Sequence, residues 1–142
     1  MRFMIIVKAT KGSEAGVMPE EKLLAAMAKY HEELQKAGVL LDASGLQRSS
    51  KGWRIKYSGE KRTVIDGPFT EAKELIAGYT LIQVKSREEA MEWARRFPNP
   101  AVDGKEGEIE LRQVFELEDF GPSEGVERFR KMGVGGTTKE TR

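Results

Sequence analysis

The stretch IDGPFTEAKE at residues 65–74 decides how the chain can fold, because it joins two segments that both have strand character. A β-branched run precedes it at residues 62–65, and a long apolar run follows it at residues 75–85. Within the stretch, Asp66 can bond to nearby backbone N–H groups and Gly67 tolerates a positive φ. A simple hairpin needs only two turn residues. This longer and more highly charged connection is therefore the first place to expect a functional site.

Composition predicts a globular protein with one domain. The chain has 142 residues, of which 39% are hydrophobic and 33% charged, enough to bury one substantial core. Twenty-four basic and 23 acidic residues give a net charge of +1, which predicts no direct binding to nucleic acid or to an anionic membrane. Since the chain contains no cysteine, disulfides, zinc–thiolate sites and thiol catalysis are excluded. No apolar run approaches the ~20 residues of a membrane helix, so we expect a cytoplasmic protein.

Hydrophobic periodicity predicts six strands and two long helices. Gly38 is the expected end of the first helix, and Ser86 with Glu89 forms a capping box that opens the second. A polar loop is expected at residues 11–17. In chain order the predicted elements are a strand at 3–9, a helix at 19–37, a strand at 39–46, hairpin arms at 52–57 and 61–65, a strand at 76–85, a helix at 87–97 and a strand at 109–115.

This order predicts an α+β fold of the ferredoxin-like, split βαβ type. One antiparallel sheet would carry two helices on one face, with a β-hairpin inserted between the halves. The first 118 residues form this domain, and residues 119–142 form a C-terminal extension that is partly disordered and includes a short helix at 126–132. No third long helix covers the second face of the sheet, where we expect Met4, Ile6, Thr80, Ile82, Val84 and Val114. A homodimer that packs sheet face against sheet face would bury these side chains.

The residues of the central stretch resemble a known family. The sequence DGPF at residues 66–69, with TEAKE at 70–74 and GY at 78–79, is similar to the signature of the DGPF proteins in the YCII-related superfamily. The resemblance covers residues 1–118 and implies a fold of the dimeric α+β barrel type. It also implies a cleft beside the sheet, in which some relatives use a His–Asp pair. Some DGPF proteins occur beside extracytoplasmic-function sigma factors, which implies a possible functional link to such a factor.

His31 matches the family's helical histidine, because it precedes a leucine and then a glycine at the expected positions. The partner aspartate is missing, since the second helix ends in RRFP at residues 95–98. The nearest acid there is Asp103, so Asp66 is the preferred partner. A histidine held by a carboxylate could act as a general base. Equally, His31 could be a partly buried histidine that only bonds to a backbone carbonyl.

Other candidates also have two interpretations. Asp66 could orient His31 or could simply cap its own turn. Lys73, Arg54 and Tyr79 are candidate substrate-binding residues, although solvent-exposed or core positions explain them equally well. The two tryptophans are expected to pack in the core. A single histidine and no cysteine predict no metal site, and no motif for a cofactor is present.

Two functions follow from these observations. The preferred one is a non-catalytic accessory or small-ligand-binding dimer that takes a small polar ligand. The alternative is a small-molecule enzyme in which His31 is the base and Asp66 the orienting acid.

Overall fold

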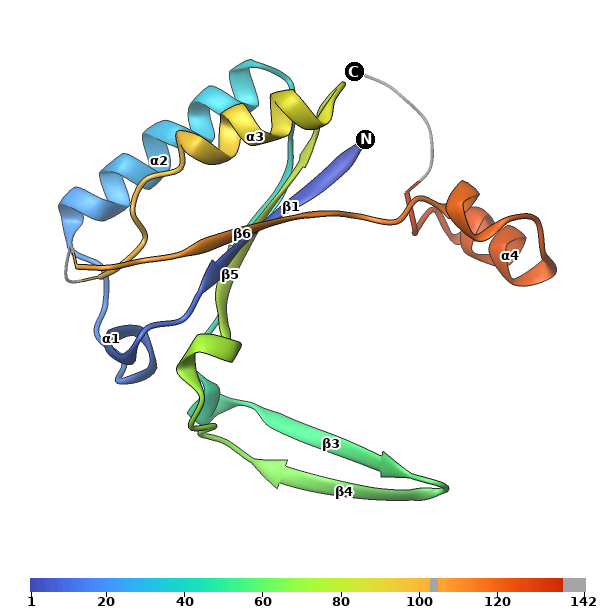
Figure 1. The fold of residues 1–142 in the computed structure, drawn as a ribbon, viewed down its shortest axis with the longest axis horizontal. Coiled ribbons are helices and arrows are strands. Elements are labelled where there is room, and N and C mark those ends of the chain that lie inside the picture. The colour runs from blue at the N-terminus through green and yellow to red at the C-terminus, as the bar shows by residue number, and fades with distance from the viewer. Residues whose placement is uncertain (103–104, 137–142) are drawn as a thin grey trace.

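The computed structural model describes residues 1–102 and 105–136 (Figure 1). The helices and strands are β1 (Arg2–Lys8), α1 (Lys11–Glu14), α2 (Glu21–Lys36), β2 (Leu40–Gly45), β3 (Trp53–Ser58), β4 (Lys61–Asp66), β5 (Ile76–Gln83), α3 (Arg87–Arg95), β6 (Ile109–Gln113) and α4 (Glu124–Met132). Short 3-10 turns lie at Ser49–Lys51, Ala72–Glu74 and Leu117–Phe120. The predicted strands and the two long helices are all present.

A short helix, α1, forms where a polar loop was expected. Its N-terminus is closed by reciprocal hydrogen bonds, because Ser13 N donates to Thr10 Oγ1 at 3.1 Å and Thr10 N donates to Ser13 Oγ at 2.9 Å. Such a capping box satisfies backbone donors that a single turn would otherwise leave unpaired. A polar segment of this kind carries no apolar periodicity, so the pattern did not predict a helix.

The main sheet has the strand order β2-β5-β1-β6, with every neighbouring pair antiparallel. Counted without the hairpin, the second and third strands lie together at one side and the first and fourth at the other. This is the predicted ferredoxin-like, split βαβ topology. Strands β3 and β4 form a separate two-stranded sheet, inserted between β2 and β5.

The core lies between the sheet and the helices α2 and α3, which run side by side over one face (Figure 1). Ile5 of β1, Leu34 of α2 and Ile82 of β5 are fully buried there. Tyr30 of α2 is also buried, and its hydroxyl donates to the backbone oxygen of Trp93 on α3 at 2.7 Å. This bond joins the two helices and gives the buried phenol a partner.

The second face of the sheet differs from the prediction. Met4 pairs with Leu81 and Ile6 with Tyr79, so these four side chains share the face without helices. Directly paired residues lie on the same face of an antiparallel sheet.

The residues that were expected there, Thr80, Ile82 and Val84, are buried beneath the helices instead. The predicted alternation of side chains along β5 was correct. Only the register with β1 decides which of the two alternating sets of side chains faces the helices.

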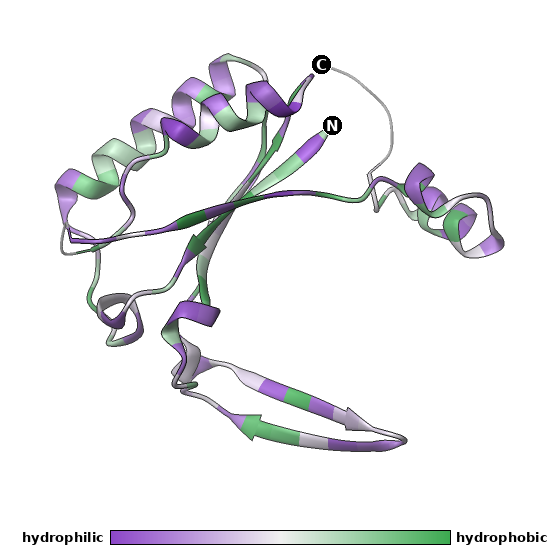
Figure 2. Cartoon of the chain, viewed as in Figure 1, coloured by the Kyte–Doolittle hydropathy of each residue, from purple (hydrophilic) through white to green (hydrophobic). Residues whose placement is uncertain are grey.

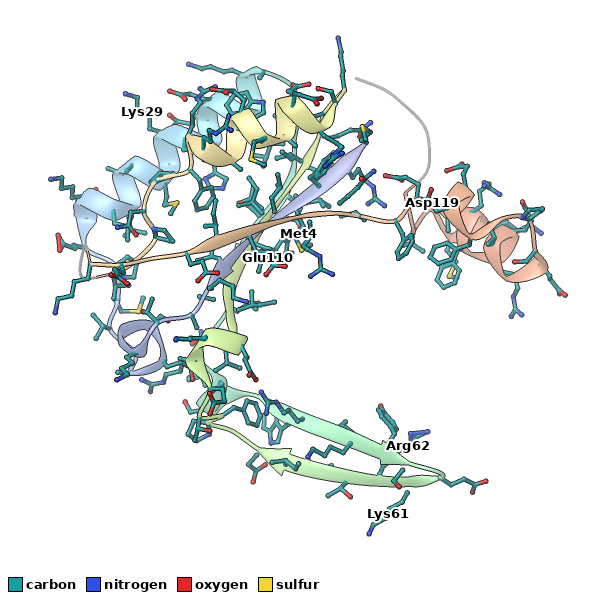
Figure 3. The ribbon with its side chains drawn as sticks, viewed as in Figure 1. Met4, Lys29, Lys61, Arg62, Glu110 and Asp119 are labelled. Atoms are coloured by element: carbon teal, nitrogen blue, oxygen red, sulfur yellow. The ribbon has the colours of Figure 1, made fainter. Side chains whose placement is uncertain are left out.

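Charged residues border the apolar centre of this open face. Glu110 of β6 accepts a hydrogen bond from Arg112 at 3.0 Å and lies 3.6 Å from Lys8 Nζ. The hydrogen bond from Arg112 lowers the pKa of Glu110 below its ordinary value. Figure 3 labels Met4 and Glu110, which come from neighbouring strands of this face.

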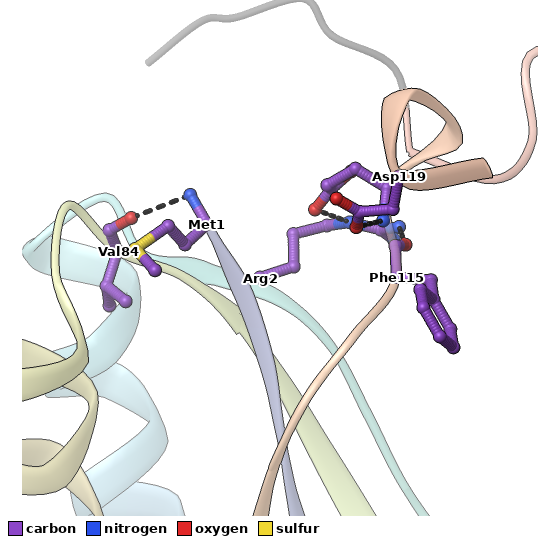
Figure 4. A network of polar contacts seen from close by, with 6 residues as sticks. Met1, Arg2, Val84, Phe115 and Asp119 are labelled. Atoms are coloured by element: carbon purple, nitrogen blue, oxygen red, sulfur yellow. Dashed lines mark hydrogen bonds and ion pairs between the residues drawn. The ribbon is translucent and has the colours of Figure 1, made fainter. Parts of the chain in front are cut away.

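The C-terminal segment is attached to the first strand through a small polar network (Figure 4). Arg2 donates to Glu116 Oε2 at 3.0 Å and to the backbone oxygen of Phe115 at 3.1 Å. Glu116 N in turn donates to Asp119 Oδ2 at 2.8 Å. Helix α4 follows within the predicted C-terminal extension. Part of the segment that was expected to be disordered, residues 137–142, lies outside the described residues.

The hairpin and α4 both extend on the side of the sheet opposite to α2 and α3 (Figure 1). Trp53, Ile55 and Tyr57 alternate along β3 and share one face of the hairpin with Val64, and all four are exposed. Figure 2 shows the apolar segments in both hairpin strands. Trp53, which is 66% exposed, therefore does not pack in the core of the chain as expected. A two-stranded ribbon has no second layer of its own to cover it.

Candidate ligand-binding cavity

A cavity of about 920 Å³ lies on the helix side of the sheet, between the N-terminal half of α2 and the adjoining ends of β2 and β5. Leu23, Leu24 and Met27 of α2 line it, and Leu24 is 51% exposed. The apolar stripe of α2 therefore has two roles. Its C-terminal half, with Tyr30 and Leu34, packs in the core, and its N-terminal half forms one wall of the cavity.

His31 lies in this cavity where the two halves of the stripe meet. Its Nδ1 is 2.7 Å from the backbone oxygen of Met27, one helical turn earlier, and its Nε2 is 2.8 Å from Thr80 Oγ1 on β5. A carbonyl oxygen can only accept, so Nδ1 carries a proton, and in the neutral form of the imidazole Nε2 accepts from the Thr80 hydroxyl. Both ring nitrogens thus have a hydrogen-bond partner within the chain. One partner is a backbone carbonyl, as in the second interpretation of His31, and the other is the Thr80 hydroxyl.

Aromatic neighbours hold the imidazole in place. The rings of Tyr30 and Phe97 meet His31 edge to face, with centroid separations of 5.4 and 6.1 Å. Burial raises the pKa of Tyr30 well above its ordinary value, so this ring stays neutral beside the histidine. The imidazole is thus in contact with Tyr30, Phe97, Met27 and Thr80, and Thr80 is only 2% exposed and borders the cavity.

Two exposed cations, Arg48 and Lys51, also line the cavity and form what we call its rim. Arg48 Nη1 donates to the backbone oxygen of Ala15 at 3.3 Å. The guanidinium occupies the space that a side chain at position 16 would fill, and Gly16 has a φ of +85°, which favours glycine. No aspartate or glutamate is among the lining residues in the described part of the chain.

The DGPF sequence contacts the turn that carries these cations. Ser49, between Arg48 and Lys51, accepts a hydrogen bond from Phe69 N at 2.9 Å through its hydroxyl oxygen. The same serine is bound by Glu14 of α1, which accepts from Ser49 N at 2.9 Å and from its hydroxyl. A Cβ on Gly67 would overlap the backbone oxygen of Ser49, so glycine is required for this close approach.

We call this arrangement of Glu14, Ser49, Gly67 and Phe69 the latch. It connects three segments that are far apart in the sequence, namely α1, the turn after β2 and the end of the hairpin. The DGPF sequence therefore contacts the turn that bears Arg48 and Lys51 through Ser49.

The predicted site residues do not all meet. His31 lines the cavity. Tyr79 of β5 also borders it, but its side chain lies on the open face of the sheet with Met4 and Ile6, where its hydroxyl donates to Asp42 Oδ2 at 2.8 Å. Asp66 is exposed at the end of β4, is not among the lining residues, and makes no side-chain hydrogen bond or ion pair within the described residues.

Two further candidates also lie outside the lining of the cavity. Arg54 stacks its guanidinium 3.8 Å from the centre of the Phe69 ring, and Lys73 is exposed in a 3-10 turn. Asp103, the other acid considered for His31, lies outside the described residues.

Sequence reasoning missed Thr80 and Arg48. Thr80 lies 49 positions after His31 and has the same pattern as any inward strand residue, so no local signal marked it. The polar run RSSK at residues 48–51, between two strands, was the only available indication of a cationic rim. Among residues 1–102 and 105–136, no group of three potential metal ligands is present.

Comparison with known proteins places this structure in a family. The model of the YCII-related domain matches residues 1–118. The chain belongs to the YCII-related family. Its DGPF sequence and its split βαβ sheet agree with this assignment.

The relatives carry little information on activity. The chain is 28% identical over 95 residues to an uncharacterised protein of Rhizobium meliloti (strain 1021), covering 67% of this chain and 75% of that protein. Among solved structures, it is similar to the 5-chloro-2-hydroxyhydroquinone dehydrochlorinase of Burkholderia phenoliruptrix AC1100 in complex with 2,5-dihydroxybenzoquinone. That likeness has 14% identity and a TM-score of 0.45, over 82% of this chain and 95% of the other.

Proposed function

We propose that this YCII-related protein binds a small molecule in the cavity beside α2 and acts by binding rather than by catalysis. The observation that carries the proposal is the cavity itself. It combines a volume of about 920 Å³ with an apolar wall and one hydrogen-bonded polar pair, His31 and Thr80. Apolar cavities of this size with a few fixed polar groups are typical of small-molecule sites.

The chemistry of the lining favours binding over acid–base catalysis. A catalytic histidine is usually oriented by a carboxylate, which also stabilises the imidazolium. The described lining contains no carboxylate, and a backbone oxygen holds Nδ1 of His31 instead. In the alternative enzyme Asp66 would orient His31. Asp66 is not among the residues that line the cavity, so it would have to reach His31 from outside it.

The single histidine makes the proposal directly testable. We would titrate the protein with octanoate, octanamide, 3-phenylpropanoate and 3-phenylpropanamide and follow the imidazole cross-peaks of His31 by NMR. At least one compound should move these cross-peaks in a saturable manner at a concentration of about 1 mM or below.

Two tryptophan variants provide the control. Ala28 lines the cavity, whereas Ala26 is exposed on the same helix outside the lining. Ala28→Trp should fill the cavity and abolish the shifts, and Ala26→Trp should leave them unchanged. If none of the four compounds moves the His31 cross-peaks, or if both variants respond alike, binding in this cavity is refuted.

A further inference from the structure

The arrangement of charge around the cavity restricts the kind of molecule it accepts. We infer that the ligand is an amphiphilic anion whose carboxylate binds Arg48 and whose apolar part lies against Leu24 and Met27. This inference rests on the proposed binding function and goes beyond it by assigning a chemical class to the ligand and a role to Arg48.

The first observation is the state of the Arg48 guanidinium. It is exposed at the rim, has one hydrogen bond of 3.3 Å to a backbone oxygen, and forms no ion pair within the described residues. A guanidinium has five N–H donors in a planar fork that matches the two oxygens of a carboxylate. Most of its donors are therefore free to bind a carboxylate oxygen.

The second observation is that two cations but no carboxylate belong to the described lining of the cavity. In a chain with 23 acidic residues, the described lining holds Arg48 and Lys51 but no carboxylate. Glu14 keeps its negative charge when it accepts the two hydrogen bonds of Ser49, but the two cations at the rim outnumber this one carboxylate. The cavity rim therefore has a local excess of positive charge, although the whole chain is almost neutral.

The third observation is that the rim is held in place. Ser49 lies between the two cations and is bound by Glu14 on one side and by Phe69 N on the other. A binding group that is already ordered loses less conformational entropy when the ligand arrives. The latch thus positions the cations, and the Gly16 backbone leaves room for the guanidinium.

Matched acids and amides separate the inference from the proposed function. Octanoate and octanamide have nearly the same shape and differ in charge, as do 3-phenylpropanoate and 3-phenylpropanamide. Since Arg48 is exposed, we expect each acid to bind about fivefold more tightly than its amide, as judged from the His31 cross-peaks at low salt. The preference should decrease when the salt concentration is raised to about 0.5 M, whereas amide binding should not weaken.

Variants then assign the preference to Arg48. Arg48→Gln should remove the preference for the acid while leaving amide affinity within about twofold of the wild type. Arg128→Gln is the control, because it makes the same charge change at an exposed site on α4, outside the cavity lining. It should retain the full preference.

The outcomes are distinguishable. Binding of acid and amide with equal affinity overturns the anion assignment and leaves the binding function intact. A preference that survives Arg48→Gln overturns the role of Arg48. A failure of all four compounds to move the His31 cross-peaks overturns the binding function, and the inference with it. The salt dependence in the wild-type protein tests the charge preference even if the Arg48 variant fails to fold.

Discussion

At the scale of single residues, His31 shows how contacts decide between two interpretations of one side chain. Its position on the helix was predicted, but its partners are Met27 O and Thr80 Oγ1 and not a carboxylate. Asp66, the proposed partner, lies on the exposed hairpin and outside the cavity lining. The pairing of His31 with Asp66 stays a prediction, and it has a direct test.

The substitution Asp66→Asn provides this test. The amide keeps the turn chemistry of the aspartate and removes only its charge. Because no described contact links the two residues, we expect the imidazole cross-peaks of His31 to keep their positions at fixed pH in the variant. A clear displacement of these cross-peaks, without wider spectral change, would establish that Asp66 and His31 share a site.

Tyr30 leads to a prediction about alkaline pH. Burial raises the pKa of its phenol in the folded chain, whereas the unfolded chain releases this proton near pH ~10. The folded state then binds more protons than the unfolded state above that pH, so the free energy of unfolding decreases as the pH rises. In Tyr30→Phe, the free energy of unfolding should decrease less between about pH 8 and about pH 11 than in the wild type, as measured by urea denaturation.

The same variant should be destabilised at neutral pH by about 1 kcal/mol, because Trp93 O loses its donor. Tyr57→Phe is the control, since Tyr57 is 67% exposed on the hairpin. In this control, the free energy of unfolding should decrease with rising pH as much as in the wild type. An equal decrease in all three proteins would contradict the role of Tyr30.

At the scale of elements, the latch explains why the stretch at residues 65–74 has a glycine at position 67. The backbone of Gly67 lies against the Ser49 carbonyl, and Gly67 N donates to Gly52 O at 3.0 Å. The hairpin is thereby attached to the turn that bears Arg48 and Lys51. The stretch in which a functional site was expected thus also connects two elements of the fold.

Gly67→Ala should disrupt this connection. The added methyl group meets a backbone atom that cannot rotate away, so we expect a loss of about 1–3 kcal/mol in the free energy of unfolding. Gly52→Ala is the matched control, because its nearest neighbour would be at 3.6 Å and its φ of −134° suits alanine. Chemical denaturation of both variants checks the difference. Equal stability of the two would show that the latch contributes nothing.

At the scale of the whole molecule, the open sheet face raises the question of assembly. Met4, Ile6, Tyr79 and Leu81 form its centre, and the hairpin and α4 extend on the same side of the sheet (Figure 1). We propose that a second copy packs on this face, as its apolar centre and charged border resemble the plan of a protein–protein interface.

The proposed link to a sigma factor likewise stays a prediction. In the described part of the chain, no helix is long and apolar enough to cross a membrane.

Light scattering at micromolar concentration tests the dimer. The measured mass should be twice the chain mass of 15.9 kDa, with about 800 Å² buried on each partner. Leu81→Lys should shift the mass toward the monomer because it places a charge at the centre of the face. Met91→Lys, on the exposed side of α3, should not. A wild-type mass near 16 kDa would refute the dimer.

The sequence alone determined the strands, the two long helices and their order. Apolar alternation, Gly38 as a helix end and Ser86 as the N-cap of the second long helix are local signals, and each acts over a few residues. Of the predicted capping box, only the bond from Glu89 N to Ser86 Oγ forms, because the Glu89 carboxylate accepts from Lys85 N instead of Ser86 N. The order of strands and helices was then sufficient to predict the split βαβ sheet. His31 was also identified, because its place on α2 is a property of helical spacing.

The tertiary structure decided which surfaces face one another. The register of β5 against β1 turned Ile82 and Val84 toward the helices, and one residue of slip would have reversed this. The contacts of His31 with Thr80, and of Ser49 with Glu14 and Phe69, join residues 20 to 49 positions apart. Such pairs depend on how the elements pack and have no local periodicity, which is why the cavity and its cationic rim became visible only in the folded chain.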